Sequence, residues 1–206
     1  MINYPNKKII NNKEKISNTN RGMILEDKIN ASNKYYKDNN IAIIYKKPIP
    51  IQVVEVQYPK RSKALISKAY YKVPSTTDYN GIYKGYYIDF EAKQTRNKTS
   101  FPISNIHTHQ LDHLEKIYEH KGISFVIIEF VSYNECYLLD SSKMIKYIKY
   151  MQRKSLPYNW IKDNGILILA NAYINLDYIK AIDILLSEDN ANDNCYKEEE
   201  EKEEIK

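Results

Sequence analysis

Apolar and polar positions alternate along residues 86–93, and the rest of the chain is organised around this stretch. Because side chains in an extended strand point to opposite faces with a period of two, Ile88, Phe90 and Ala92 share one face. The other face carries polar or charged side chains, namely Tyr87, Asp89, Glu91 and Lys93. The alternation therefore predicts a strand with one face in the core and a chemically active second face.

Similar patterns predict the remaining elements. Apolar positions at helical spacing predict helices over 20–38, 104–121, 141–154 and 176–186. Apolar or β-branched runs predict strands over 41–45, 51–57, 124–131, 135–139 and 166–169, with 41–45 buried and 124–131 the central strand. This order indicates an α/β protein with a mixed β-sheet flanked by helices.

Local signals set the expected ends and turns. Asn20 is a candidate N-cap of the first helix, whose buried face would carry Leu25, Ile29, Ser32 and Tyr36. Gly122 is expected to close the helix over 104–121. Residues 78–81 form a turn signal, and Gly85 marks another tight approach.

Length and composition narrow the class of protein. The 206 residues, 43% of them hydrophobic, suffice for one domain with tails. No apolar run approaches the roughly 20 residues of a membrane span, and residues 1–20 lack the core of a signal peptide, so we expect a cytoplasmic protein. Cys136 and Cys195 are too far apart in sequence for a disulfide framework or a zinc knuckle; Cys136 is expected in the core.

Charge is distributed unevenly along the chain. Residues 187–206 hold nine acids and three lysines, a net charge of −6, so that the rest of the chain carries +11. We expect a disordered basic arm over 1–19, a domain over 20–186 and a disordered acidic tail over 187–206. A basic body favours a polyanionic partner such as nucleic acid, although lysine-rich solubility is an alternative explanation.

The basic character is densest over residues 58–72, which contain five cations and no acid. Cations interleaved with aromatic side chains suit phosphate contact and base stacking. The alternative is an exposed lysine-rich hairpin or helix without a ligand. The candidate DNA-binding residues are Lys60, Arg61, Lys63, Lys68 and Tyr71.

Glu91 and Lys93 are same-face neighbours on the strand, and Asp78 lies thirteen residues upstream of Glu91. Two carboxylates can hold a hard divalent cation, and a lysine can orient water or stabilise charge on a phosphate. The pattern suits metal-assisted phosphodiester cleavage. The alternative is an exposed strand face with an ordinary Glu–Lys pair.

Three neighbouring features leave alternatives open. Glu26 either favours the helix dipole or faces the metal site as an outer carboxylate. His109 and His113 have the i, i+4 spacing of a zinc site, but no cysteine lies nearby and no acid completes a His-Glu-x-x-His pattern, which favours a solvent-facing or DNA-facing position. Gln110 is placed to reach back to the strand.

Several motifs together resemble the RecU family of Holliday-junction resolvases from low-GC Gram-positive bacteria, over residues 20–185. They are Asn20-Arg21-Gly22-Met23, Lys46-Lys47-Pro48, Tyr58-Pro59-Lys60-Arg61-Ser62, Ser75-Thr76-Thr77-Asp78-Tyr79-Asn80-Gly81-Ile82-Tyr83-Lys84-Gly85, Ile88-Asp89-Phe90-Glu91-Ala92-Lys93 and His109-Gln110. The arm and the tail lie outside this resemblance.

The resemblance implies a restriction-endonuclease-like PD-(D/E)xK fold with a basic stalk over about 58–74. It implies a homodimer that nicks four-way DNA junctions symmetrically with Mg²⁺ or Mn²⁺, with the RecA recombinase as a further partner. Carried onto this sequence, the metal-associated residues would be Thr76, Asp78, Glu91 and Gln110, and Lys93 would stabilise the transition state.

Two other functions compete with this one. A junction-binding or recombinase-modulating protein without catalysis would not need the carboxylates beside a lysine. A sequence-specific restriction-type nuclease would need base-reading side chains, and the stalk offers little beyond Arg61.

Overall fold

The computed structural model describes residues 24–60, 63–72 and 76–188. The expected arm over 1–19 and the proposed N-cap Asn20 therefore lie outside the described residues, as do Arg61 and Cys195. The last described helix covers residues 178–188, so it continues past the expected domain boundary at 187. None of the helices within the described ranges is both long and apolar enough to cross a membrane.

A six-stranded mixed sheet forms the centre of the molecule, in the order β1-β4-β5-β7-β8-β10. Its strands are β1 (Ile43–Lys46), β4 (Tyr79–Tyr83), β5 (Tyr86–Thr95), β7 (Ile123–Phe130), β8 (Glu135–Asp140) and β10 (Ile166–Leu167). β5 and β7 pair in parallel, whereas the other neighbours pair antiparallel. β5 is thus hydrogen-bonded on both sides.

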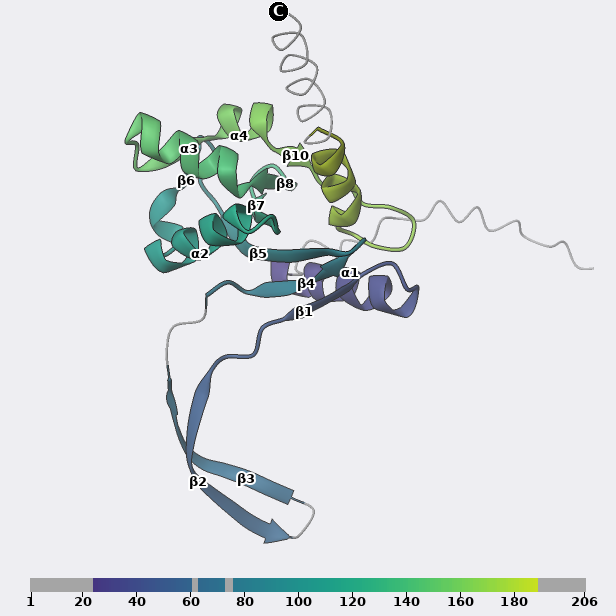
Figure 1. Cartoon of the computed structure of the whole chain (residues 1–206), viewed down its shortest axis with the longest axis vertical. Coiled ribbons are helices and arrows are strands. Elements are labelled where there is room, and N and C mark those ends of the chain that lie inside the picture. The colour runs from purple at the N-terminus through teal and green to yellow at the C-terminus, as the bar shows by residue number, and fades with distance from the viewer. Residues whose placement is uncertain (1–23, 61–62, 73–75, 189–206) are drawn as a thin grey trace, which may run out of the picture.

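Helices cover both faces of this sheet (Figure 1). One face packs against α1 (Leu25–Asp38) and the helix over 178–188, through a core that includes Ile29, Phe90, Phe125 and Tyr178. The other packs against α2 (Thr108–Glu119), α3 (Ser141–Met151) and α4 (Tyr158–Asn164). This arrangement confirms the predicted α/β fold with a mixed sheet flanked by helices.

Several expectations about burial are confirmed. The four residues expected on the inner face of the first helix are buried, and all eight residues of β7 are buried. Cys136 is also buried in the core. The strand over 41–45 was expected to be buried, but β1 lies at the edge of the sheet. Its side chains Ile43 and Tyr45 are 54% and 50% exposed.

A long hairpin projects from the domain (Figure 1). It consists of β2 (Ile51–Lys60) and β3 (Lys63–Tyr71), paired antiparallel with Ile51 opposite Tyr71 and Lys60 opposite Lys63. We call residues 51–71 the stalk. Its position agrees with the predicted stalk, but it begins at 51 because the β-branched segment 51–57 pairs with the second strand rather than forming a separate one.

The glycine-containing turns differ from the prediction. Residues 79–81 belong to β4, so the turn expected over 78–81 is wrong. Gly81 is required because a Cβ there would lie 2.1 Å from the carbonyl oxygen of Ile43 in β1. The tight turn lies instead at Lys84 and Gly85, which have positive φ angles of 50° and 84°; nothing approaches within 4 Å of a Cβ built on Gly85.

The remaining differences concern short elements and helix ends. α2 ends at Glu119, and Lys121 rather than Gly122 adopts the left-handed conformation, with φ of 64°. α3 ends at Met151 instead of 154, and the predicted strand over 166–169 is shortened to β10. The pattern did not predict α4, the ribbon of β6 (Ser100–Pro102) with β9 (Ser155–Pro157), or the 3-10 turn Ile103–Asn105.

Replacing Gly81 with alanine tests the close approach of β1 and β4. We expect Gly81→Ala to lower the free energy of unfolding by about 1–3 kcal/mol, because the added methyl group forces the two backbones apart. The loss would be measured by urea unfolding, with an m-value that stays the same in the variant.

Gly85→Ala serves as the comparison. Its added methyl group contacts no other atom, but alanine must adopt the positive φ of this position, which costs about 1–2 kcal/mol. Gly85→Asn should recover part of that loss, since Asn tolerates this region. Unchanged stability of Gly81→Ala would contradict the close approach.

Candidate functional site

Glu91 lies in the middle of β5 with its side chain directed towards α2 and wholly shielded from solvent. Its Oε2 accepts hydrogen bonds from the Gln110 side chain, at 2.8 Å, and from the backbone N–H of Asp78, at 3.1 Å. Its Oε1 lies 2.5 Å from the ammonium group of Lys93. The alternative of an exposed strand face with an ordinary Glu–Lys pair is therefore wrong, because Glu91 on this face of β5 is buried.

Asp78 immediately precedes β4, which pairs with β5 so that Tyr79 lies opposite Phe90. The register places the Asp78 backbone beside Glu91, thirteen residues away in sequence. The Asp78 carbonyl accepts a hydrogen bond of 2.7 Å from the backbone N–H of Lys47, just after β1. The acid predicted from the distant upstream motif is thus positioned by neighbouring strands.

The pKa of Glu91 is raised to about 7, because burial and, after it, the adjacent Asp78 carboxyl group raise the pKa more than the Lys93 ammonium lowers it. Although Lys93 is close enough for an ion pair, Glu91 Oε1 has no hydrogen bond of good geometry. This oxygen therefore has the Lys93 ammonium beside it but no hydrogen bond of its own.

The donor set at this place suits a hard divalent cation. Asp78 and Glu91 supply carboxylate oxygens, the ligands that Mg²⁺ prefers, and Mg²⁺ typically keeps several waters and takes only one or two protein carboxylates. Across the described ranges, no group of three or more His, Cys, Asp and Glu side chains converges to form a full protein cage. The residues therefore fit a cation that completes its coordination with water and phosphate.

Gln110 contacts Glu91, as predicted, and both polar atoms of its side-chain amide make hydrogen bonds. The Nε2 atom donates to Glu91, while Oε1 accepts from the backbone N–H of His107 at the start of α2. Thr76 is exposed, and its hydroxyl accepts a hydrogen bond of 3.1 Å from Lys47. The structure thus brings Asp78, Glu91, Lys93 and Gln110 together directly, and connects Thr76 to the site through Lys47.

A second buried carboxylate, Asp89, lies on the same face of β5. It accepts hydrogen bonds from Lys47, Thr77 and Tyr87, and His113 Nε2 lies 3.2 Å away. The alternation along residues 86–93 predicts that Asp89 lies on this face, but no role was predicted for Asp89, Lys47 or Thr77. All three lie within the motifs that resemble the RecU family, and this was the one indication in the sequence that they belong to the site.

The other candidates are spread over the molecule. Glu26 forms an ion pair with Lys46 and lines a cleft of about 210 Å³ together with Asp78 and Gln94. His113 faces Asp89, and His109 is exposed. The stalk carries the described DNA-binding candidates Lys60, Lys63, Lys68 and Tyr71, all of them exposed.

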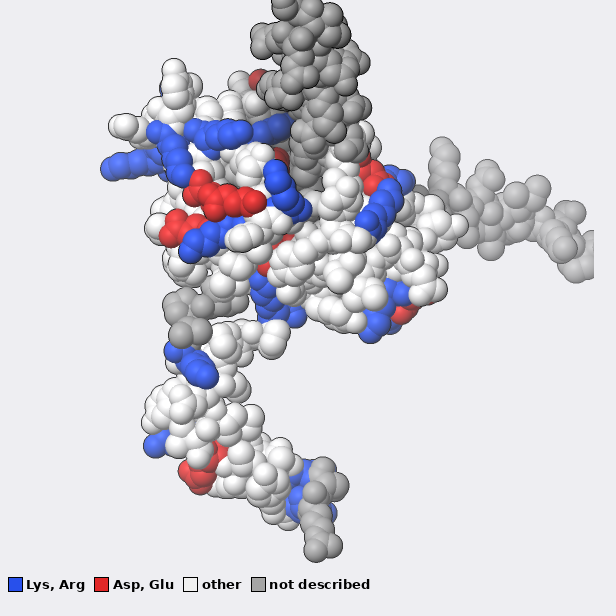
Figure 2. All heavy atoms as spheres, viewed as in Figure 1, with Lys and Arg blue, Asp and Glu red and all other residues white. Residues whose placement is uncertain are grey.

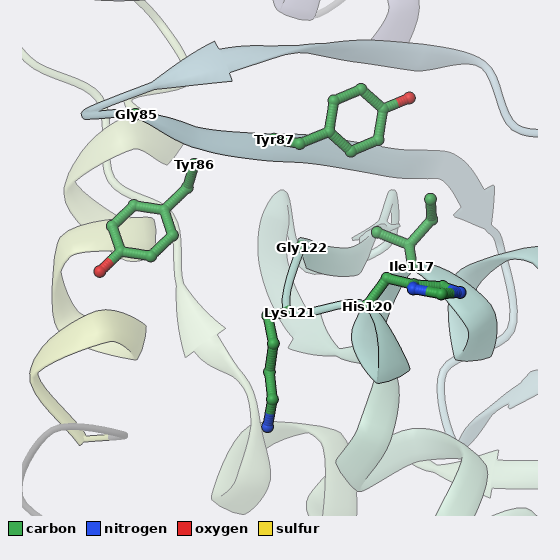
Figure 3. A pocket seen from close by; sticks show the side chains of 7 residues that line it. All are labelled: Gly85, Tyr86, Tyr87, Ile117, His120, Lys121 and Gly122. Carbon is green, nitrogen blue, oxygen red and sulfur yellow. The ribbon is translucent and has the colours of Figure 1, made fainter.

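A separate cleft of about 400 Å³ lies near the start of β5. Figure 3 shows Tyr86 and Tyr87 of the strand on one side and the end of α2, with His120 and Lys121, on the other. Because no carboxylate lines it, this cleft does not have the donor set of the Glu91 site.

The mixed sheet flanked by helices, with two carboxylates and a lysine gathered at its central strand, defines a restriction-endonuclease-like α/β protein. The family model described as Recombination protein U matches residues 20–184. The chain therefore belongs to the RecU family.

Curated relatives extend over nearly the whole domain. A protein of Oceanobacillus iheyensis named Holliday junction resolvase RecU is 49% identical over 194 residues, covering 89% of this chain and 99% of its own. A protein of the same name from Bacillus cytotoxicus is 46% identical over 195 residues, covering 89% and 98%. A third, from Bacillus thuringiensis, is 46% identical over 193 residues, covering 88% and 96%.

The raised pKa of Glu91 predicts a pH-dependent stability in the absence of metal. The folded protein favours the protonated form, so stability is present at low pH and is lost as pH rises from about 4.5 to about 7, by about 3 kcal/mol in total. Glu91→Gln mimics the protonated carboxyl group, so it should be more stable than wild type above about pH 7.5 and similar near pH 4. Thermal unfolding in EDTA would measure this.

Glu135→Gln is the matched control, with the opposite sign. Hydrogen bonds from Tyr158 and Tyr137 lower the pKa of Glu135, so its contribution to stability is present at neutral pH and is lost on acidification. This variant should be less stable than wild type at neutral pH. If wild type and Glu91→Gln have the same thermal stability above about pH 7.5, the electrostatic account of the site is contradicted.

Proposed function

We propose that this protein is a structure-selective endonuclease that resolves Holliday junctions by metal-dependent, symmetric nicking of opposing strands in recombination and repair. The observation that carries the proposal is the buried Glu91 carboxylate, which faces Asp78 and Lys93 and has an oxygen without a hydrogen bond. Relatives at 46–49% identity are named Holliday junction resolvases, which supports the substrate.

Asp78 and Glu91 would hold Mg²⁺, or alternatively Mn²⁺. A bound ion would polarise the scissile phosphate and lower the pKa of a coordinated water. Lys93, whose side chain is 25% exposed and whose ammonium lies beside Glu91, would orient the water or stabilise charge developing on the phosphate. Gln110 would orient Glu91 through its amide N–H, while Thr76 stays a proposed metal-associated residue at the exposed margin of the site.

The stalk would provide the contact with the junction. Figure 2 shows Lys and Arg side chains at intervals along it and over the domain to which it is attached. Its side chains are exposed on nearly every position of both strands, including tyrosines that can stack on bases. We infer a homodimer, because a two-fold pair presents two equivalent sites to a junction of similar symmetry.

Two further expectations come from the sequence and its family resemblance. The RecA recombinase stays a predicted partner, and the cytoplasm stays the predicted location. Neither depends on the geometry of the site.

Cleavage of a labelled synthetic four-way junction tests the proposed site. Wild type should produce paired symmetric nicks with Mg²⁺ and none with EDTA. Asp78→Asn and Glu91→Gln should each lower the cleavage rate at least about 100-fold, because the ion loses a charged ligand, while junction binding measured by gel shift survives.

The same assay separates the competing functions. Junction binding without cleavage in any divalent metal would favour the non-catalytic binding protein, and normal cleavage by either variant would rule out the assigned residues. Linear duplex that competes as well as the junction would favour a restriction-type nuclease.

Neutralising the stalk tests its role in DNA binding. Each phosphate contact contributes about 0.9 to the slope of log affinity against log salt, so replacing Lys60, Lys63 and Lys68 with glutamine should reduce that slope by up to about 3. Fluorescence anisotropy over a range of salt concentrations would measure it. The matched control replaces three exposed lysines with glutamine in the same way: Lys146, Lys162 and Lys180. They belong to α3, α4 and the helix over 178–188, which lie away from the stalk (Figure 1). An equal loss in both variants would argue against the stalk as the binding surface.

A further inference from the structure

The two ends of the stalk meet at the candidate metal site. The chain leaves β1 at Lys46 and enters the stalk through residues 47–50, and it returns to β4 through residues 72–78. Lys47 stands at the first of these connections, and Thr76, Thr77 and Asp78 stand at the second. Both segments that link the stalk to the sheet therefore carry residues that lie beside the candidate metal site.

Lys47 bridges the two connections with both its backbone and its side chain. Its backbone N–H donates to the carbonyl of Asp78 at 2.7 Å. Its ammonium donates to the hydroxyls of Thr76, at 3.1 Å, and Thr77, at 2.6 Å. A single residue at the outgoing connection thus contacts three consecutive residues of the returning one.

Asp89 anchors this bridge to the sheet. Its carboxylate is 0% exposed and accepts from the Lys47 ammonium at 2.7 Å and from the Thr77 hydroxyl. The oxygen that accepts from Lys47, Oδ2, also accepts from the Tyr87 hydroxyl at 2.9 Å and lies 3.2 Å from Nε2 of His113 in α2. A buried carboxylate is tolerated only with such partners. Removing its charge leaves the Lys47 ammonium, on a side chain that is only 15% exposed, without its counterion.

We propose that Lys47, Thr77 and Asp89 form a polar clamp at the base of the stalk, which holds Asp78 in position for metal binding. The inference rests on the proposed metal site at Asp78 and Glu91. Asp89 and Lys47 act as positioning residues, because they act through the segment that carries Asp78. Partners of this kind typically change metal affinity about 10- to 100-fold when they are removed.

The clamp is tested by titrating Mn²⁺ alone into DNA-free protein and measuring the heat of binding. Asp89→Asn and Thr77→Val should each weaken Mn²⁺ binding about 10- to 100-fold, and Thr77→Ser, which retains the hydroxyl group, should restore it. Hydrogen exchange supplies a second readout: amides of residues 76–79 should exchange faster in Asp89→Asn, whereas those of the buried strand β7 keep the wild-type protection.

Asp177→Asn is the matched control for loss of a buried, hydrogen-bonded aspartate. Asp177 is 7% exposed, accepts hydrogen bonds from Tyr36 and Asn171 and forms an ion pair with Lys180, beside α1 rather than at the stalk. This variant should lose stability but keep the Mn²⁺ affinity of wild type. If Asp89→Asn unfolds, Thr77→Val against Thr77→Ser still decides the question, because that pair removes and restores one hydroxyl.

Asp78→Asn separates failure of the clamp from failure of the metal site. If it weakens Mn²⁺ binding while Asp89→Asn and Thr77→Val bind as wild type does, the clamp is overturned and the metal site stands. If Asp78→Asn also binds Mn²⁺ with wild-type affinity, the proposed site itself is overturned. Equal weakening by Asp177→Asn would reduce the effect to general destabilisation and overturn the clamp as well.

Discussion

The central position of β5 is the constraint on which the candidate site depends. Its backbone pairs with β4 on one side and, in parallel, with β7 on the other, so the strand cannot slide or turn without breaking both ladders. A one-residue slip would exchange the two faces and send Phe90 towards α2. The stacked contacts of Phe90 with Tyr79 and Phe125 fix the register and keep Asp89 and Glu91 on the α2 side.

Two carboxylates beneath a helix would destabilise the fold if they were left alone, because burying a charge without partners costs several kcal/mol. Their partners come from separate segments: Gln110 and His113 from α2, Lys47 from the end of β1, and Thr77 from the return of the stalk. The folded sheet therefore assembles the site, and hydrogen bonds in the site connect Lys47 and Thr77, which flank the stalk, to β5.

The sequence predicted what short-range patterns determine. The alternation along β5 identified Glu91 and Lys93, and the long apolar run identified β7. The contacts of Asp89 could not be predicted, because a period-two pattern does not say that its polar face is covered, and Lys47 lies 42 residues upstream. The turn expected around Gly81 failed for a related reason: the glycine serves an approach of β1, which local composition does not reveal.

The two buried carboxylates of β5 differ in how their charge is compensated. Asp89 has an ammonium group, two hydroxyl groups and an imidazole around it. Glu91 has Lys93 and two N–H donors, yet it faces a second carboxylate and retains an oxygen without a hydrogen bond. A divalent cation at the proposed site would meet the Glu91 oxygen that takes part in no hydrogen bond, whereas at Asp89 it would have to displace the Lys47 ammonium.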